Sequence, residues 1–243
     1  MTARVMWTHV QAWWGHGTPR VAGLLVVLVV GLTAPASGPH VSRVAAVLSG
    51  PRVTVLAGQL QIGPPWTWLL LSLLFVVASL PLVQLDPAPI SLTLVRGVSR
   101  RQWAVARLLT VVVAAVAFLA LVVLVAAVTL VIRPHPGLLV TASAAKDLGL
   151  WALSLTGLGW WQIGAGMVAP SAWPGFVTVV LLLGFSGFGS VFSPWLPTAQ
   201  TILALHGLPG TLSVVAGAWY LGGWTALGGT AAWGLARTLV GYH

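Results

Sequence analysis

Acidic and sulfur-bearing side chains are scarce in this sequence of 243 residues, which has no cysteine, no glutamate and only two acids in total. Without cysteine, a disulfide framework and a thiolate metal site are both excluded. Charged residues make up 5% of the chain, whereas a soluble domain contains roughly 25%. Water is therefore not the expected solvent for most of this protein.

Hydrophobic residues, by contrast, make up 58% of the chain. They form uncharged runs, several of which approach the roughly 20 residues needed to cross a hydrocarbon core. The sequence therefore predicts an all-α polytopic membrane protein with six transmembrane helices in one transmembrane domain, residues 1–243. The expected spans are residues 21–35, 66–85, 108–132, 148–169, 175–192 and 212–235.

Three further segments complete the predicted fold. Residues 1–20 carry an apolar set that is typical of an N-terminal interfacial helix, with a weak end at Gly15 and Gly17. Residues 36–64 are read as a long external loop with one interfacial helix. Residues 193–212 are apolar but broken by proline and glycine, which favours a re-entrant or interfacial stretch before the sixth span.

The first hydrophobic segment has an alternative interpretation. Ala34-Pro35-Ala36 follows a basic start and a short apolar run, which is also the pattern of a cleaved signal peptide. Sequencing the mature N-terminus would separate a retained span from a cleaved one.

The distribution of basic residues predicts orientation, because loops rich in Lys and Arg stay in the cytoplasm. With both termini inside, the cytoplasmic side holds seven bases and the outside four. We therefore expect a multi-pass protein of the plasma membrane of a bacterium, with the N-terminus and C-terminus cytoplasmic. The cytoplasmic bases are Arg4, Arg20, Arg96, Arg100, Arg101, Arg107 and Arg237; the external ones are Arg43, Arg52, Arg133 and Lys146.

Residues 86–107, between the second and third expected spans, are the most informative part of the chain. Asp86 followed by Pro87 is a good helix start, and Gly97 is a good helix end, so a short cytoplasmic helix is predicted between them. Ser99 and Gln102 have the spacing of a capping box. This box would begin a second helix that runs on into the third span.

The sequence Leu94-Val95-Arg96-Gly97-Val98-Ser99-Arg100-Arg101-Gln102-Trp103, with the Ala-Arg-Leu-Leu that follows at 106–109, resembles the Arg-x-x-Ser-Arg segment of type-2 ABC transporter permeases. In that family the segment contains the coupling helix, which contacts the ATPase subunit. The resemblance implies that residues of this segment couple to a partner: Ile90, Leu94, Arg96, Ser99, Arg100, Arg101, Trp103 and Arg107. The simpler alternative is a positively charged anchor that obeys the positive-inside rule.

This resemblance implies a permease subunit of an ATP-driven exporter for an amphipathic or hydrophobic cargo, such as a drug, peptide or lipid. Its expected partners are cytosolic ABC ATPase subunits, a second copy or a sister permease, and membrane lipids, without nucleic acid. No cofactor is expected on this chain; ATP and Mg would bind the partner ATPase. The alternative function is a membrane scaffold or anchor that does not transport and recruits a cytosolic partner.

The chain lacks the residues of a self-contained enzyme, so no catalytic residue and no metal site is predicted. Lys146 is the only lysine, and its surroundings are not a phosphate-binding loop. Gly184-Phe185-Ser186-Gly187 matches the GxSG of rhomboid-type proteases, but residues 212–240 provide no histidine base. The expected spans also contain no Asp, Glu, Lys or His, which argues against a proton-driven carrier.

Two features inside the expected spans have competing explanations. Gln162 either lines a translocation path or makes a hydrogen bond between helices. The glycine pairs Gly222-Gly223 and Gly228-Gly229 in the last span are explained most simply by close helix packing.

Overall fold

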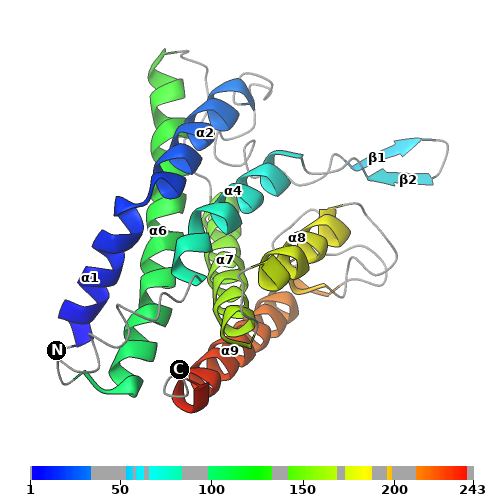
Figure 1. Ribbon diagram of the computed structural model, residues 1–243. Coiled ribbons are helices and arrows are strands. Elements are labelled where there is room, and N and C mark those ends of the chain that lie inside the picture. The colour runs from blue at the N-terminus through cyan, green and yellow to red at the C-terminus, as the bar shows by residue number, and fades with distance from the viewer. Residues whose placement is uncertain are drawn as a thin grey trace.

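The computed structural model shows a mainly helical arrangement and a small β-hairpin in the described residues (Figure 1). The structure describes residues 2–33, 53–56, 59–62, 66–83, 98–132, 142–168, 173–187, 196–198 and 212–239. The helices in these ranges are α1 (Thr2–Gly15), α2 (Gly17–Thr33), α4 (Trp66–Val83), α6 (Arg100–Ile132), α7 (Ala142–Val168), α8 (Trp173–Gly187) and α9 (Val214–Leu239). The strands are β1 (Val53–Leu56) and β2 (Gln59–Ile62).

The long helix α6 organises one half of the molecule. Its 33 residues are dominated by Leu, Val and Ala, and α1 and α2 lie along it (Figure 1). On the other half, α7 packs most extensively against α9, and α8 lies beside α7 and α4. Helix α4 lies between the two halves and contacts α2, α6, α7 and α8.

An aromatic cluster joins these halves in the core. The ring of Phe118 on α6 lies edge-on between Phe75 of α4, at 5.5 Å, and Trp151 of α7, at 6.3 Å. All three side chains are buried. Edge-to-face pairs at such distances each contribute about 0.5–1.5 kcal/mol beyond the burial of their area, so this cluster fixes how α4, α6 and α7 meet.

The prediction of six transmembrane helices is wrong. Among the residues that the structure describes, only α6 contains a segment long and apolar enough to cross a membrane, Arg101–Thr129. A second crossing is obtained only if α1 and α2, which bend by 68° between Gly15 and Gly17, form one broken span. Helices occur near all six expected positions, but six crossings are not supported.

The helices that fail as spans do so for two physical reasons. Helices α4 and α8 are short, with apolar segments of Trp66–Leu82 and Gly175–Phe185, and α4 also contains Pro81. Helices α7 and α9 have 27 and 26 residues, but many of these are Gly, Trp, Ser or Thr. Such residues lower the hydropathy of a helix that is long enough to cross.

The described part of the loop predicted at residues 36–64 is a β-hairpin, and the interfacial helix predicted in this loop is not tested by the described residues. Strands β1 and β2 pair antiparallel, with Val53 opposite Ile62 and Leu56 opposite Gln59. The sequence supports this pairing, because Val53-Thr54-Val55 is β-branched and only Ala57-Gly58 separates the strands. The remaining residues of this predicted loop lie outside the described part of the chain.

Several other predicted features also lie outside the described residues. They are the coupling helix between Asp86 and Gly97, the alternative cleavage site at residues 34–36, and most of the stretch at 193–212. By contrast, the weak end predicted for the first helix is confirmed, since α1 ends at Gly15 and α2 begins at Gly17.

Candidate functional site

The predicted capping box at the start of α6 is confirmed. The backbone N–H of Ser99 donates to Gln102 Oε1 at 3.1 Å, and the backbone N–H of Gln102 donates to Ser99 Oγ at 3.2 Å. The first helical bond, from Trp103 N to Ser99 O, measures 3.0 Å. These bonds satisfy donors that a helix start leaves free. They fix the point at which the segment after α4 becomes α6.

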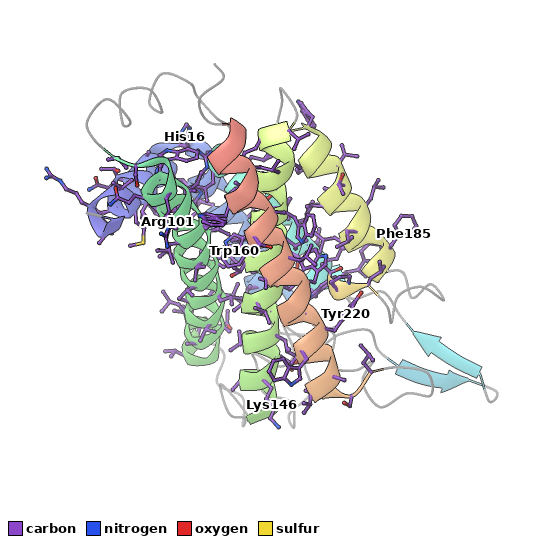
Figure 2. All side chains as sticks on the ribbon, turned by 90° about the horizontal axis from the view of Figure 1, so that it is seen from below. His16, Arg101, Lys146, Trp160, Phe185 and Tyr220 are labelled. Carbon is purple, nitrogen blue, oxygen red and sulfur yellow. The ribbon has the colours of Figure 1, made fainter. Side chains whose placement is uncertain are left out.

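The structure separates the predicted coupling residues into exposed and buried groups. Ser99 and Arg101 are exposed, and Figure 2 shows Arg101 at one end of α6. Arg100 is the first residue of α6, although its side chain lies outside the described set. Ile90, Leu94 and Arg96 also lie outside it. The exposed part of the predicted surface therefore starts at the capping box.

Trp103 and Arg107, in contrast, face the protein interior. Their side chains are 1% and 6% exposed, respectively. Helix α1 covers this side of α6, with Val5 in the same buried cluster as Trp103. Both side chains therefore contact this chain, whereas the side chain of Arg101, in the same turns of α6, faces outward.

Arg107 links three helices. Its guanidinium lies over the ring of Trp103, 5.1 Å from the centroid, and its Nη2 donates to the backbone oxygen of Leu82 in the last turn of α4. His9 of α1 meets the same Trp103 ring edge-on at 6.1 Å. A cation next to the carbonyls at a helix C-terminus is favourable because those carbonyls carry partial negative charge.

Sequence reasoning missed this role of α1. The first helix was expected to lie on the membrane surface, but its buried face, including Val5 and Trp13, packs into the protein. The indole N–H of Trp13 donates to the backbone oxygen of Ala78 on α4 at 2.7 Å. An amphipathic stripe indicates that a helix face is covered, but the stripe is the same whether protein or lipid covers it.

Gln162 is fully buried between α7 and α4. Its Oε1 accepts a hydrogen bond from Ser79 Oγ at 2.7 Å, and its Nε2 lies 3.5 Å from the backbone oxygen of Val76. The structure therefore contains the interhelical hydrogen bond that was one of the two explanations for this residue. The predicted role of Gln162 in a translocation path stays a prediction.

The interface between α7 and α9 is built from tryptophan rings that fill glycine positions. A Cβ at Gly157 would lie 2.5 Å from Trp224 Cζ3, and a Cβ at Gly229 would lie 2.5 Å from Trp160 Cε3. Trp161 fills the position of Gly228 in the same way. Close packing is thus confirmed for Gly228-Gly229, whereas a Cβ at Gly223 would meet nothing within 4 Å.

Trp160 also connects this interface to α6. Its indole N–H donates to the backbone oxygen of Leu108 at 3.0 Å, and Figure 2 shows it in the middle of the molecule. Leu108 follows Arg107 directly. The first turns of α6 are therefore held by α4 on one side and by α7 on the other.

Large apolar side chains remain exposed on several helices. Those of α8 form a stripe at every fourth position, and Figure 2 shows its last member, Phe185, pointing away from the bundle. The α8 stripe consists of Trp173, Val177, Leu181 and Phe185.

An open groove of about 530 Å³ beside α6 and α7 is lined only by aliphatic side chains, among them Val116, Ala120 and Leu148.

No protein-family model matches this sequence, and no curated protein matches it. Within the described ranges, no group of three or more His, Asp or Glu side chains is placed to hold a metal ion. Ser186 of the GxSG match belongs to α8, but its side chain is outside the described set.

Proposed function

We propose that this chain is a membrane-embedded permease subunit of an ATP-driven ABC exporter, whose energy comes from a separate cytosolic ATPase. The observation that carries the proposal is the capping box of Ser99 and Gln102, which begins a helix of 33 residues. At 1.5 Å per residue such a helix is about 50 Å long, whereas the hydrocarbon core is about 30 Å thick. Its first turns would stand in the cytoplasm beside the segment that resembles a coupling helix.

The exposed apolar surface supports a location in the bilayer. Soluble monomers rarely expose contiguous apolar patches of more than a few hundred Å², and this chain exposes large apolar side chains along α2, α6, α8 and α9. When these faces contact lipid, the free-energy penalty of exposing apolar surface to water is absent. The aliphatic lining of the groove beside α6 is also compatible with contact to lipid chains.

The positions of two bases support the proposed orientation. Arg101 and Lys146 lie at opposite ends of the molecule (Figure 2). The first turn of α6 lies at the same end as the start of α1 and the end of α9 (Figure 1). A cytoplasmic docking surface at that end would agree with cytoplasmic termini.

The one helix among the described residues that is long and apolar enough to cross on its own cannot enclose a path for a cargo. The path would therefore lie between this chain and a second copy or a sister permease. The resemblance implies that ATP-driven closure of the ATPase subunits pushes on residues 86–107 and displaces α6. The cargo would be hydrophobic or amphipathic, because the exposed surface beside α6 is aliphatic.

Purification of the full chain from its native membrane tests this proposal. The expected result is co-purification of an ATPase whose activity rises in the presence of the chain. Replacing Arg96, Arg100 and Arg101 by Glu should abolish this stimulation, because the basic docking surface is reversed. Lys146→Glu is the matched control, since this base is exposed at the opposite end. Unchanged stimulation in the triple variant would remove the docking assignment.

A second function, a membrane anchor that recruits a cytosolic partner, is favoured by a different observation. Only one helix among the described residues is long and apolar enough to cross on its own, and one crossing is sufficient for an anchor. A partner that co-purifies without nucleotide-binding motifs would support the anchor. An ATPase that depends on the chain would support the permease.

A further inference from the structure

Arg107 connects the two helices at either end of the predicted docking segment. Helix α4 ends at Val83 and α6 begins at Arg100, so the predicted docking segment leaves one helix and enters the other. The guanidinium of Arg107, one turn beyond Trp103, donates to the backbone oxygen of Leu82, one residue before the end of α4. This hydrogen bond therefore joins the two helices on either side of the segment.

The surroundings of Arg107 hold its guanidinium in place. Trp103 lies under it and is almost fully buried, while His9 of α1 packs against the edge of the same ring. Hydrogen bonds that involve a charged group are stronger than neutral ones, and a cation over an indole ring adds further attraction when both are removed from water. The contact is thus a defined joint between α1, α4 and α6.

We propose that Arg107 is a positioning residue that keeps the ends of α4 and α6 at a fixed separation, so that a push on residues 86–107 moves both helices together. This inference rests on the proposed function for the push, whereas the fixed separation belongs to the chain itself. The two parts are tested by separate measurements.

The chemistry favours arginine over lysine at this position. A planar guanidinium can lie flat on an indole ring and donate in its own plane to a carbonyl oxygen, whereas an ammonium group is a compact point charge. Arg107→Lys should therefore keep the charge but loosen the joint. Arg107→Gln removes the charge as well.

The separation of the helices can be measured without any partner. Because the chain contains no cysteine, Leu80→Cys on α4 and Leu109→Cys on α6 introduce the only two thiols for spin labels. Pulsed electron resonance on the full chain in lipid should give one narrow distance distribution. Arg107→Gln should broaden or shift it, and Arg107→Lys should do so less.

The control for this measurement is Arg101→Gln, which removes the same charge from an exposed position on the same helix. It should leave the distribution unchanged. An identical distribution in Arg107→Gln, Arg107→Lys and the parent would overturn the joint. If Arg107→Gln does not fold, the comparison of Arg107→Lys with the parent decides in the same way.

Transmission to the ATPase is tested by measuring binding and stimulation separately. In Arg107→Gln we expect the ATPase to co-purify as in the parent, while its stimulation falls by about tenfold or more, since tenfold corresponds to the lower limit for one lost hydrogen bond to a charged group. Arg107→Lys should recover part of it. Full stimulation in Arg107→Gln would overturn transmission. If the parent itself neither binds nor stimulates an ATPase, the proposed function fails with it, and the distance measurement still decides the joint.

Discussion

The α7–α9 interface and the joint around Arg107 hold helices together in opposite ways. Between α7 and α9 the fit is one of shape, since aromatic rings occupy the space that glycines leave open. At the joint, the buried guanidinium of Arg107 donates a hydrogen bond to the last turn of α4 and lies over the ring of Trp103. Adding atoms to a close-packed interface destabilises it by overpacking, whereas removing a donor destabilises a contact that depends on a hydrogen bond. The two regions should therefore respond to different substitutions.

The largest effect is expected from Gly157→Ala in the α7–α9 interface. The new Cβ would lie 2.5 Å from Trp224 Cζ3 and 2.7 Å from Thr225 Oγ1. Neither neighbour can move freely, because Thr225 donates to the backbone oxygen of Leu153 and the Trp224 ring stacks on Trp161. Overpacking of this kind costs about 1–3 kcal/mol, which thermal unfolding in detergent would show as a lowered midpoint.

The control for this substitution is Gly149→Ala on the same helix. A Cβ there would meet nothing within 4 Å, so the change should stabilise α7 by up to about 1 kcal/mol through helix propensity. Equal midpoints for the two alanine variants would show that the interface is not specified by shape.

A smaller effect is expected from Ser99→Ala at the capping box beside the joint. The variant loses the acceptor for the backbone N–H of Gln102, and such losses cost about 1 kcal/mol. Amide hydrogen exchange at Gln102 and Trp103 should become faster. Ser99→Thr keeps the hydroxyl and should restore protection; if it exchanges as fast as Ser99→Ala, the side-chain cap is not what holds this turn.

The comparison also explains how far the sequence could predict this molecule. Local signals were sufficient for the capping box and for the break at Gly15 and Gly17, because neighbouring residues determine both. The burial of Arg107 depends on α1 and α4, which are far away in the sequence, and no local pattern encodes that contact.

The predicted number of membrane crossings was wrong for a related reason. Apolar runs located the helices, but helix length and the content of Gly and Trp determine which of the described helices is long and apolar enough to cross.

The hairpin was missed because its signal is short. Two strands of four residues lie within a stretch that also contains several Gly and Pro residues, together with Arg43 and Arg52. Alternation over so few residues is weak, and only the two-residue connection with glycine indicated a hairpin. Trp160 and Trp161 of α7 are also evident in the sequence, but the glycines that they contact lie on α9, and no local pattern pairs the two helices.

The smallest effect tests a second polar contact between helices, the pair of Ser79 and Gln162. This buried bond joins α4 to α7 at 2.7 Å. A double-mutant cycle with Ser79→Ala and Gln162→Leu should give a coupling energy of about 0.6 kcal/mol, the average for hydrogen bonds between helices in membranes. A small energy is expected because the single hydroxyl proton of Ser79 can be donated to the backbone oxygen of Val76, 2.9 Å away, when Gln162 is lost. A coupling near zero, together with lost cargo transport in Gln162→Leu alone, would favour a path-lining role over a structural one.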